Sequence, residues 1–206
     1  MATPSRSVLR RERERRDTRR RILDAARDLF VNQGIENVTM RAIAERLEYT
    51  PTAIYHHFRD KDALLQELIH QDFRTHAAIF AQLEKIEDPV ERLRRTGEAY
   101  VQFGLDHPSL YRFLFVTPHP ETKDIDKQPD EDAYGMLRAT VRQCIDQGRF
   151  RDGYTDVEQV SQICWAGCHG LVSLALNFGE HDFLEWRDTR KTWGLMCDAM
   201  IAGIRK

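Results

Sequence analysis

The segment TPTAIYHHFRDK, residues 50–61, brings together side chains that could do chemistry. Tyr55, His56 and His57 could form a metal site or an acid–base pair, or they could line the outer face of a helix that binds another molecule. Adjacent residues on a helix point about 100° apart, so His56 and His57 do not converge on one ion. Zinc-binding helices instead place two histidines four residues apart. The spacing therefore favours a binding face over a metal site.

A second candidate is the pair Cys164 and Cys168, four residues apart and followed by His169. Two thiols beside an imidazole resemble part of a zinc set. The surrounding sequence is apolar and offers no fourth ligand nearby, and buried cysteines usually behave as small hydrophobic residues. We expect no metal and no cofactor, and the sequence leaves open what else the two cysteines do.

Motifs of the common enzyme classes are missing from the sequence. It contains no G-x-S-x-G, no Walker loop, no G-x-G-x-x-G after a strand and no H-E-x-x-H. We therefore predict a protein that is not an enzyme. The competing hypothesis is a helical ligand-binding or enzymatic protein whose first helices do other work.

The residues around the first segment predict helices that would position it. An apolar stripe runs along the first of these and ends at Gly34, a typical residue just after a helix. Thr39, Thr50 and Asp60 are suitable N-caps for the next three helices. Pro51 suits the first turn of the short helix that carries the histidines.

This short helix has two different faces. Its apolar face carries Ile54 and Phe58, with His57 between them. Its other face carries hydroxyl, imidazole and guanidinium groups, which suit phosphate oxygens and base edges: Thr52, Tyr55, His56 and Arg59. We therefore interpret residues 39–59 as a helix-turn-helix whose second helix reads DNA.

Charge is distributed unevenly along the chain. Residues 1–21 hold nine arginines against three acidic residues, a net charge of +6, which leaves −8 on the remainder. A basic end on an acidic body indicates a local contact with a polyanion. For residues 1–16 we expect a disordered basic arm; the alternatives are an extension of the first helix or an arm that reaches a DNA groove.

From about residue 19 to residue 65 the chain resembles the DNA-binding domain of TetR-family transcriptional regulators. The shared residues are the Ala-Ala-x-x-Leu-Phe helix, Gly34, Thr-x-x-x-Ile-Ala at 39–44, Tyr-x-His-Phe at 55–58 and Asp-Lys at 60–61. One departure is Glu48, where many relatives have glycine in the turn between the two helices. If Glu48 adopts a positive φ, the strain is on the order of 1 kcal/mol.

The resemblance implies particular contacts with DNA. Tyr55, His56 and Lys61 would contact phosphates, Pro51 and Thr52 would approach bases, and Thr39 and Arg41 would meet the backbone from the preceding helix. The expected DNA-binding residues are Thr39, Arg41, Thr50, Pro51, Thr52, Tyr55, His56 and Lys61.

The rest of the chain, residues 66–206, is expected to be a helical effector-binding and dimerisation domain. WAGCHGLVSLAL resembles a TetR-type C-terminal domain with a Trp, His-Gly signature, here Trp165, His169 and Gly170. His169 is either the polar anchor of an effector pocket or a buried histidine bonded across helices. The candidate pocket residues are Phe103, Tyr111, Phe115, Trp165 and His169.

Taken together, the patterns predict an all-α protein with three parts: a basic arm at 1–16, a three-helix DNA-binding domain at 17–65 and the larger domain that follows. By resemblance, the last two long helices, about 156–178 and 186–204, would pair two copies of the chain.

The expected function is a homodimeric repressor that binds a palindromic double-stranded DNA operator and is released by a small-molecule effector; activation or ligand-independent regulation are the alternatives. No secretory signal or membrane-length apolar segment is apparent, so we expect a cytoplasmic protein that does not enter a membrane.

Overall fold

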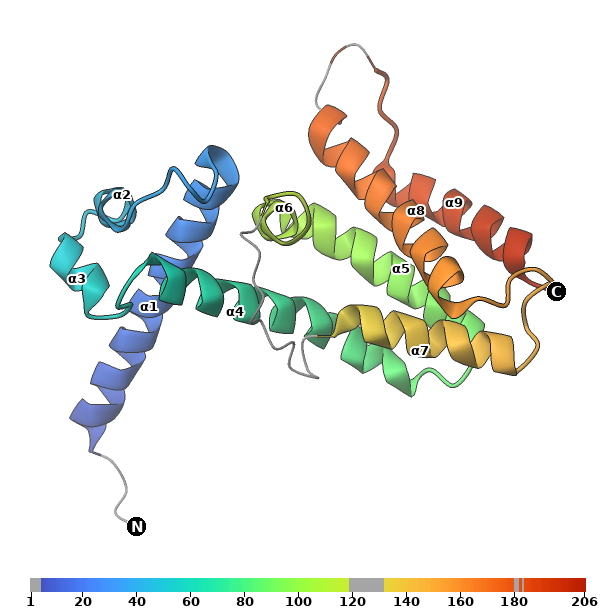
Figure 1. Cartoon of the computed structure of the whole chain (residues 1–206), viewed down its shortest axis with the longest axis horizontal. Helices are drawn as coiled ribbons and strands as arrows, with labels where there is room; N and C mark the ends of the chain where they lie inside the picture. The colour runs from blue at the N-terminus through green and yellow to red at the C-terminus, as the bar shows by residue number, and fades with distance from the viewer. Residues whose placement is uncertain (1–4, 119–131, 180–181, 183) are drawn as a thin grey trace. The chain divides into compact units, whose positions relative to one another are not determined.

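The computed structural model describes residues 5–118, 132–179, 182 and 184–206, and within these ranges it contains helices and no β-strand, which confirms the expected all-α class. An isolated antiparallel bridge joins Phe150 and Arg205. No helix in the described ranges is both long and apolar enough to cross a membrane. The helices are α1 (Arg6–Gln33), α2 (Met40–Arg46), α3 (Pro51–Tyr55), α4 (Lys61–Ala81), η1 (Gln82–Lys85), α5 (Pro89–Asp106), α6 (Pro108–Phe115), α7 (Ala133–Asp146), α8 (Val157–Phe178) and α9 (Thr189–Ile204) (Figure 1).

The helix boundaries near the predicted DNA-binding segment follow from local capping. Thr39 Oγ1 accepts a hydrogen bond from the Ala42 N–H at 3.1 Å, and Thr50 Oγ1 accepts one from the Ala53 N–H at 3.3 Å. Asp60 Oδ1 caps α4 in the same way, at 2.7 Å from the N–H of the residue three positions on. These bonds satisfy backbone donors that have no partner inside the helix, and they confirm the three predicted caps.

Helix α1 begins much earlier than the sequence suggested. It starts at Arg6, with Ser5 as its N-cap, so residues 6–16 are helical where we expected a disordered arm. The physical reason is local, because arginine and glutamate are good helix formers and Arg10 pairs with Glu14 one turn later at 3.5 Å. Residues 1–4 of the expected arm lie outside the described ranges. The alternative interpretation, a longer first helix, is the one that the structure supports.

The chain divides into two compact units. The first takes its residues from Met1–Asp72 and Ser109–Ile125, and the second from Phe73–Pro108 and Asp126–Lys206. The boundary thus falls inside α4, beyond the expected position after residue 65, and α6 belongs to the first unit.

Contacts to α1 explain this boundary. The Arg27 guanidinium binds both carboxylate oxygens of the buried Asp72 at 2.7 Å, which ties the middle of α4 to α1. The rings of Phe30 and Phe113 stack with their centroids 6.3 Å apart, and Ser109 Oγ donates to an Asp28 carboxylate oxygen at 2.9 Å, which ties α6 to α1.

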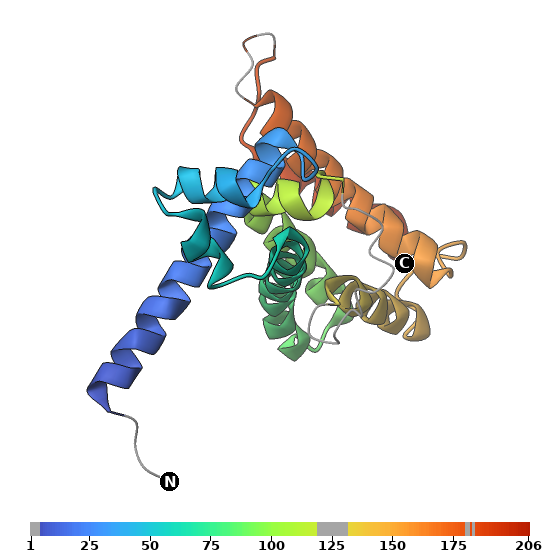
Figure 2. The same ribbon diagram turned by 60° about the vertical axis from the view of Figure 1, so that its left-hand side comes forward.

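In the second unit α5 packs against α7, α8 and α9, and α8 lies beside α9 (Figure 2). Two glycines permit close approach between these helices. A Cβ atom on Gly97 would lie 2.3 Å from the Trp193 ring, and one on Gly167 would lie 2.8 Å from the Met200 sulfur. Gly167 therefore lets α9 come close to α8. Gly170, three residues further along α8, has open space within 4 Å of its Cβ position.

Candidate nucleic-acid interface

Helix α3 presents two chemically different faces. Ile54 and Phe58 are 0% and 3% exposed and anchor the segment in the core of the first unit. On the opposite side, Thr52 and His56 are exposed and Tyr55 is 53% exposed. A phenol offers both an apolar ring and a hydrogen-bond donor, so the exposed Tyr55 is suited to bind a partner.

The capping threonines keep a hydrogen-bond donor on this surface. Thr39 and Thr50 are exposed, and each hydroxyl oxygen accepts the backbone N–H that it caps. A hydroxyl that accepts in this way still has its O–H to donate. Both threonines can therefore stabilise the helix start and donate to a phosphate oxygen at the same time.

Arg41 on α2 is also exposed. Its Nε lies 2.9 Å from a carboxylate oxygen of Glu45, and the two side chains are 79% and 64% exposed. Such an exposed pair contributes at most about 1 kcal/mol, so a phosphate can replace the carboxylate at little cost.

Lys61, in contrast, already has internal partners. It is half-buried, and its Nζ donates to the carbonyls of Ile35 and Val38 at 3.0 and 3.2 Å. Two of its three ammonium donors therefore hold the loop before α2. The sequence did not predict this positioning role, because it depends on residues more than twenty positions away.

Arg19 on α1 holds the end of the α3 segment in place, a role that sequence reasoning missed. Its guanidinium donates to the His57 carbonyl, binds both oxygens of Glu67, and lies 4.0 Å from the centre of the Phe58 ring. A signal was present, because Arg19 falls on the same helical stripe as the buried Ile22 and Ala26. A charged residue on a buried stripe usually has a specific partner.

The electrostatics around His57 favour its neutral form. Burial, followed by the nearby charges of Arg19 and Arg15, lowers the pKa of this half-buried imidazole. His57 therefore acts as a packing residue beside Phe58, while the exposed His56 remains available on the outer face.

The turn between α2 and α3 is strained at one residue. Glu48 has φ 58°, and no other non-glycine residue in the described ranges has a positive φ. The left-handed conformation that the sequence suggested is therefore present. The Tyr49 N–H donates to the Ala44 carbonyl at 2.9 Å, which closes the turn and fixes the start of α3.

The five predicted pocket residues are divided between the two units. Tyr111 and Phe115 belong to the first unit and pack on each other with ring centres 5.3 Å apart. Phe103, Trp165 and His169 belong to the second unit.

Within the second unit, the Tyr100 hydroxyl connects two of the predicted pocket residues. It accepts from Trp165 Nε1 at 3.1 Å and lies 3.1 Å from His169 Nδ1. Because Trp165 can only donate, the simplest arrangement has Tyr100 donating to Nδ1, which leaves the imidazole proton on Nε2. Burial lowers the pKa of His169, in agreement with this neutral form.

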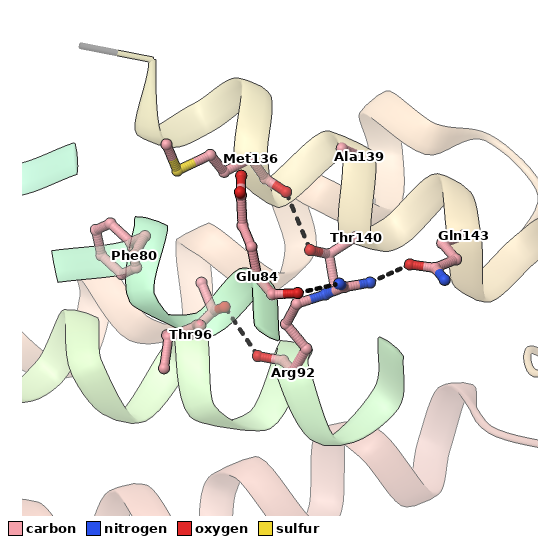
Figure 3. A pocket seen from close by; sticks show the side chains of 9 residues that line it. Phe80, Glu84, Arg92, Thr96, Met136, Ala139, Thr140 and Gln143 are labelled. Atoms are coloured by element: carbon pink, nitrogen blue, oxygen red, sulfur yellow. Dashed lines mark hydrogen bonds between the residues drawn. The ribbon is translucent and has the colours of Figure 1, made fainter. Parts of the chain in front are cut away.

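A cavity of about 270 Å³ lies elsewhere in the second unit, between η1, α5 and α7 (Figure 3). None of the five predicted pocket residues lines it. Its walls are formed by Phe80, Leu83, Glu84, Arg92, Thr96, Met136, Ala139, Thr140 and Gln143.

The four cysteines lie in environments that disfavour reaction and metal binding. All four are free and buried, and burial raises the pKa of the Cys164 thiol to about 12 and that of Cys168 further still. Cys168 Sγ donates to the Cys164 carbonyl at 3.2 Å. Thiolates, the form that binds metals and reacts, are therefore disfavoured here. Among the residues that the structure describes, no group of three or more His, Cys, Asp or Glu could hold a metal ion.

Two family models match the chain. The model described as bacterial regulatory proteins, tetR family, covers residues 22–68, which include α2 and α3. The model described as tetracyclin repressor-like, C-terminal domain, covers residues 93–200, more than half of the chain.

Curated relatives match over part of the chain. The HTH-type transcriptional regulator UidR of Escherichia coli (strain K12) is 44% identical over 59 residues, which are 29% of this chain and 30% of UidR. The HTH-type transcriptional repressor Rv1474c of Mycobacterium tuberculosis is 43% identical over 61 residues, 30% of this chain and 33% of that protein. The matches thus span about a third of the length of these relatives.

Solved structures share the fold over most of the chain. A TetR family transcription regulator from Marinobacter aquaeolei VT8 matches with a TM-score of 0.74 at 19% identity, over 94% of this chain and 99% of that one. The ketosteroid transcriptional regulator KstR2 of Mycobacterium tuberculosis matches with a TM-score of 0.70 at 21% identity, over 92% and 95%. FadR from Bacillus subtilis, solved in complex with stearoyl-CoA, matches with a TM-score of 0.69 at 15% identity, over 90% and 98%. With its helix-turn-helix, its helical second unit and both family models, the chain belongs to the TetR family of bacterial regulatory proteins and is a helix-turn-helix transcriptional regulator.

Proposed function

We propose that the protein is a homodimeric repressor that binds a palindromic operator and leaves it when a small-molecule effector binds. The observation that carries the DNA-binding part is the outward face of α3, where Tyr55 is 53% exposed opposite the fully buried Ile54. A buried anchor on one side and a row of donors on the other is what a helix needs to enter the major groove.

Different residues on this surface would have different roles. Pro51 and Thr52, at the exposed start of α3, would approach base edges, and Tyr55 and His56 would contact phosphates. Thr39, Arg41 and Thr50 would meet the backbone through the donors described above. Lys61 would contribute mainly by holding the loop before α2, with its third N–H left for a phosphate.

The basic half of α1 would add charge to this contact. Residues 6–16 are helical and exposed, and Arg15 and Arg11 lie one and two turns before Arg19, on the side of α1 that faces α3. Each phosphate that such residues neutralise releases counterions and strengthens binding without regard to sequence. We propose that this half of α1 supports affinity and not sequence choice.

An exposed apolar stripe supports dimerisation through α8 and α9. On α8, Ile163, Leu174 and Phe178 are 47%, 49% and 38% exposed, and Gly170 lies between them on the same stripe. On α9, Leu195 is 76% exposed. A second copy of the same face would bury these side chains, as in a two-fold symmetric interface. Such a dimer would present two copies of α3 to successive major grooves, about 34–36 Å apart.

The release step would be linkage between two binding sites. A ligand that prefers a conformer with mismatched α3 spacing weakens DNA binding, and DNA weakens ligand binding by the same factor. The stearoyl-CoA held by Bacillus subtilis FadR supports a small-molecule effector for a protein of this fold.

Selection of binding sites from random DNA duplexes tests the proposal. We expect an inverted repeat whose half-sites are about one helical turn, or a multiple of one, apart. A variant with Thr52 and Tyr55 both replaced by alanine should recover no enriched sequence, while an Arg95→Gln variant, altered on an exposed part of α5, should recover the same repeat. Enrichment of an unsymmetrical single site, or of no sequence by the unaltered protein, would contradict it.

A further inference from the structure

The cavity between η1, α5 and α7 is built with two unlike ends (Figure 3). Phe80 and Met136 lie at one side, where the Glu84 carboxylate also lies beside Met136, and Arg92 and Gln143 lie at the other. The ligand that fits such a space has an apolar body and one polar group.

Arg92 supplies a positive charge that the protein itself leaves uncompensated. Its Nη atoms donate to two neutral oxygens, Oε1 of Gln143 and the backbone carbonyl of Glu84. Within the described chain no carboxylate lies within ion-pairing distance of its guanidinium, and its buried Nε–H has no acceptor. A half-buried guanidinium without a carboxylate is costly, and an anionic ligand would remove that cost.

The neighbouring arginines of α5 show that this arrangement is particular to Arg92. Arg94 pairs with Asp198, and Arg95 pairs with Glu91 and Glu98, both at 2.8 Å. These two arginines are compensated by carboxylates, and neither lines the cavity. The uncompensated charge and the cavity therefore coincide at one residue.

The polar groups beside Arg92 can complete an anion site. Gln143 Oε1 accepts from Arg92, and the Nε2 of the same side chain carries two N–H donors that suit an anion. The buried Thr140 hydroxyl now donates to the Met136 carbonyl at 3.0 Å, and rotation about its C–O bond would redirect that hydrogen to a ligand. Glu84, the acidic residue of the lining, is exposed, so water solvates its charge.

The volume sets the size of the ligand. About 270 Å³ equals the liquid volume of roughly nine water molecules. A monocarboxylate with about ten non-hydrogen atoms, such as octanoate, is of the matching size.

We propose that this cavity binds a small monocarboxylate, with the carboxylate on Arg92 and the apolar chain between Phe80 and Met136. The proposal deepens the proposed function, because it gives the chemical class of the effector and the site that takes it. Binding can nevertheless be measured on the protein without DNA, so the two proposals can fail separately.

Titration calorimetry of the full chain compares three probes: octanoate, octan-1-ol and inorganic phosphate. We expect octanoate to bind at least about tenfold more tightly than octan-1-ol, since a charge-assisted hydrogen bond contributes about that factor. Inorganic phosphate, which lacks the apolar body, should bind much more weakly than octanoate. Equal affinities for octanoate and octan-1-ol, or no binding of octanoate at millimolar concentration, would overturn the proposal.

Variants assign the charge to Arg92. Arg92→Gln should weaken octanoate binding about tenfold or more and leave octan-1-ol binding unchanged, whereas Arg95→Gln, on the same helix, should leave both unchanged. Ala139→Leu narrows the cavity at another residue of its lining, so it should weaken the binding of both probes even if Arg92→Gln does not fold. Octanoate binding that survives both Arg92→Gln and Ala139→Leu would refute the site.

A DNA-binding measurement then separates the two proposals. If octanoate binds as expected but leaves the protein on its selected operator, the site stands and the release mechanism fails. If octanoate does not bind while the operator is still recognised, the site fails and the regulator stands.

Discussion

At the scale of single residues, Tyr55 and Thr52 lie on the same face of α3 and are expected to act differently. Tyr55→Phe removes one hydroxyl from a proposed phosphate contact, so we expect binding to every DNA sequence to weaken by about 1 kcal/mol, roughly fivefold. Thr52→Ala removes a proposed base contact and should change the preference between sequences. Binding isotherms on the operator, on single-base variants and on random duplex measure both effects.

A second tyrosine-to-phenylalanine substitution, away from the DNA-binding surface, controls for the loss of a hydroxyl group in general. The Tyr134 hydroxyl donates to Glu158 in the second unit, so Tyr134→Phe should leave DNA affinity unchanged. A Tyr55→Phe protein with full affinity for all duplexes would remove Tyr55 from the contact set.

Glu48 is strained by its own backbone. Its φ of 58° costs a residue with a Cβ atom about 1 kcal/mol or more, and glycine adopts this conformation freely. Glycine also makes the unfolded chain more flexible, which offsets part of the gain. We therefore expect Glu48→Gly to raise the free energy of unfolding by about 0.5–1 kcal/mol in chemical denaturation. A loss of stability would show that the Glu48 side chain makes a contribution that exceeds the strain.

His76 makes the second unit sensitive to acid. It is 5% exposed, its ring lies 4.8 Å from the rings of Phe80 and Phe103, and burial lowers its pKa from 6.5 to about 4. Between pH 6.5 and about pH 4, the His76 imidazole is protonated in the unfolded chain and neutral in the folded chain. The contribution of His76 to the free energy of unfolding is therefore fully present above pH 6.5. It falls by up to about 3 kcal/mol as the pH decreases from 6.5 to about 4.

The measurement is the free energy of unfolding at a series of pH values. His76→Gln should flatten the curve between pH 6.5 and 4, whereas His56→Gln, which alters an imidazole exposed in the folded chain, should preserve it. An unchanged acid slope in His76→Gln would mean that other groups govern acid unfolding.

At the scale of helices, the sequence predicted most where structure depends on near neighbours. Thr39, Thr50 and Asp60 cap helices through bonds that reach only three residues, so their types and positions were sufficient evidence. The two faces of α3 followed from helical spacing alone. Helix propensity, which is also a local property, accounts for residues 6–16, which are helical although arginine-rich composition is typical of a disordered arm.

Contacts between distant residues could not be predicted in this way. Lys61 binds carbonyls that precede α2, and Arg19 binds residues of the α3 segment and α4. The cavity joins η1, α5 and α7, and its lining includes none of the five pocket residues predicted from the sequence. Aromatic composition identifies apolar surface, but only the packing of helices decides where space remains.

Gly97 tests how closely α5 and α9 are packed. A Cβ atom there would lie 2.3 Å from Cζ2 of Trp193 and 3.4 Å from the sulfur of Cys168. Trp193 is 7% exposed, so its ring has little room to move. We expect Gly97→Ala to lower the free energy of unfolding by about 1–3 kcal/mol, measured by denaturant titration.

Gly194 on α9 is the matched control. A Cβ atom on it would meet nothing within 4 Å, so Gly194→Ala should follow helix propensity and gain up to about 1 kcal/mol. If Gly97→Ala also gained stability, the close approach of the two helices would be refuted.

At the scale of the whole molecule, the proposed DNA affinity depends on joining two weak half-site contacts. A single α3 segment offers few side chains to the bases, and the second copy raises affinity through the effective concentration that the dimer imposes. Loss of the dimer should therefore reduce binding to the full operator far more than binding to one half-site.

Leu195→Glu, at the proposed dimer face, tests whether operator affinity depends on dimerisation. Leu195 is 76% exposed on α9, so the change should leave the fold of one chain intact, while burying two glutamates against each other would separate the copies. We expect sedimentation to show a monomer, with affinity for the full operator reduced at least about a hundredfold and half-site affinity unchanged. Val116→Glu places the same charge on a residue that is 52% exposed in the first unit, and it should remain dimeric. A Leu195→Glu protein that stays dimeric and binds the operator fully would move the interface away from this face of α9.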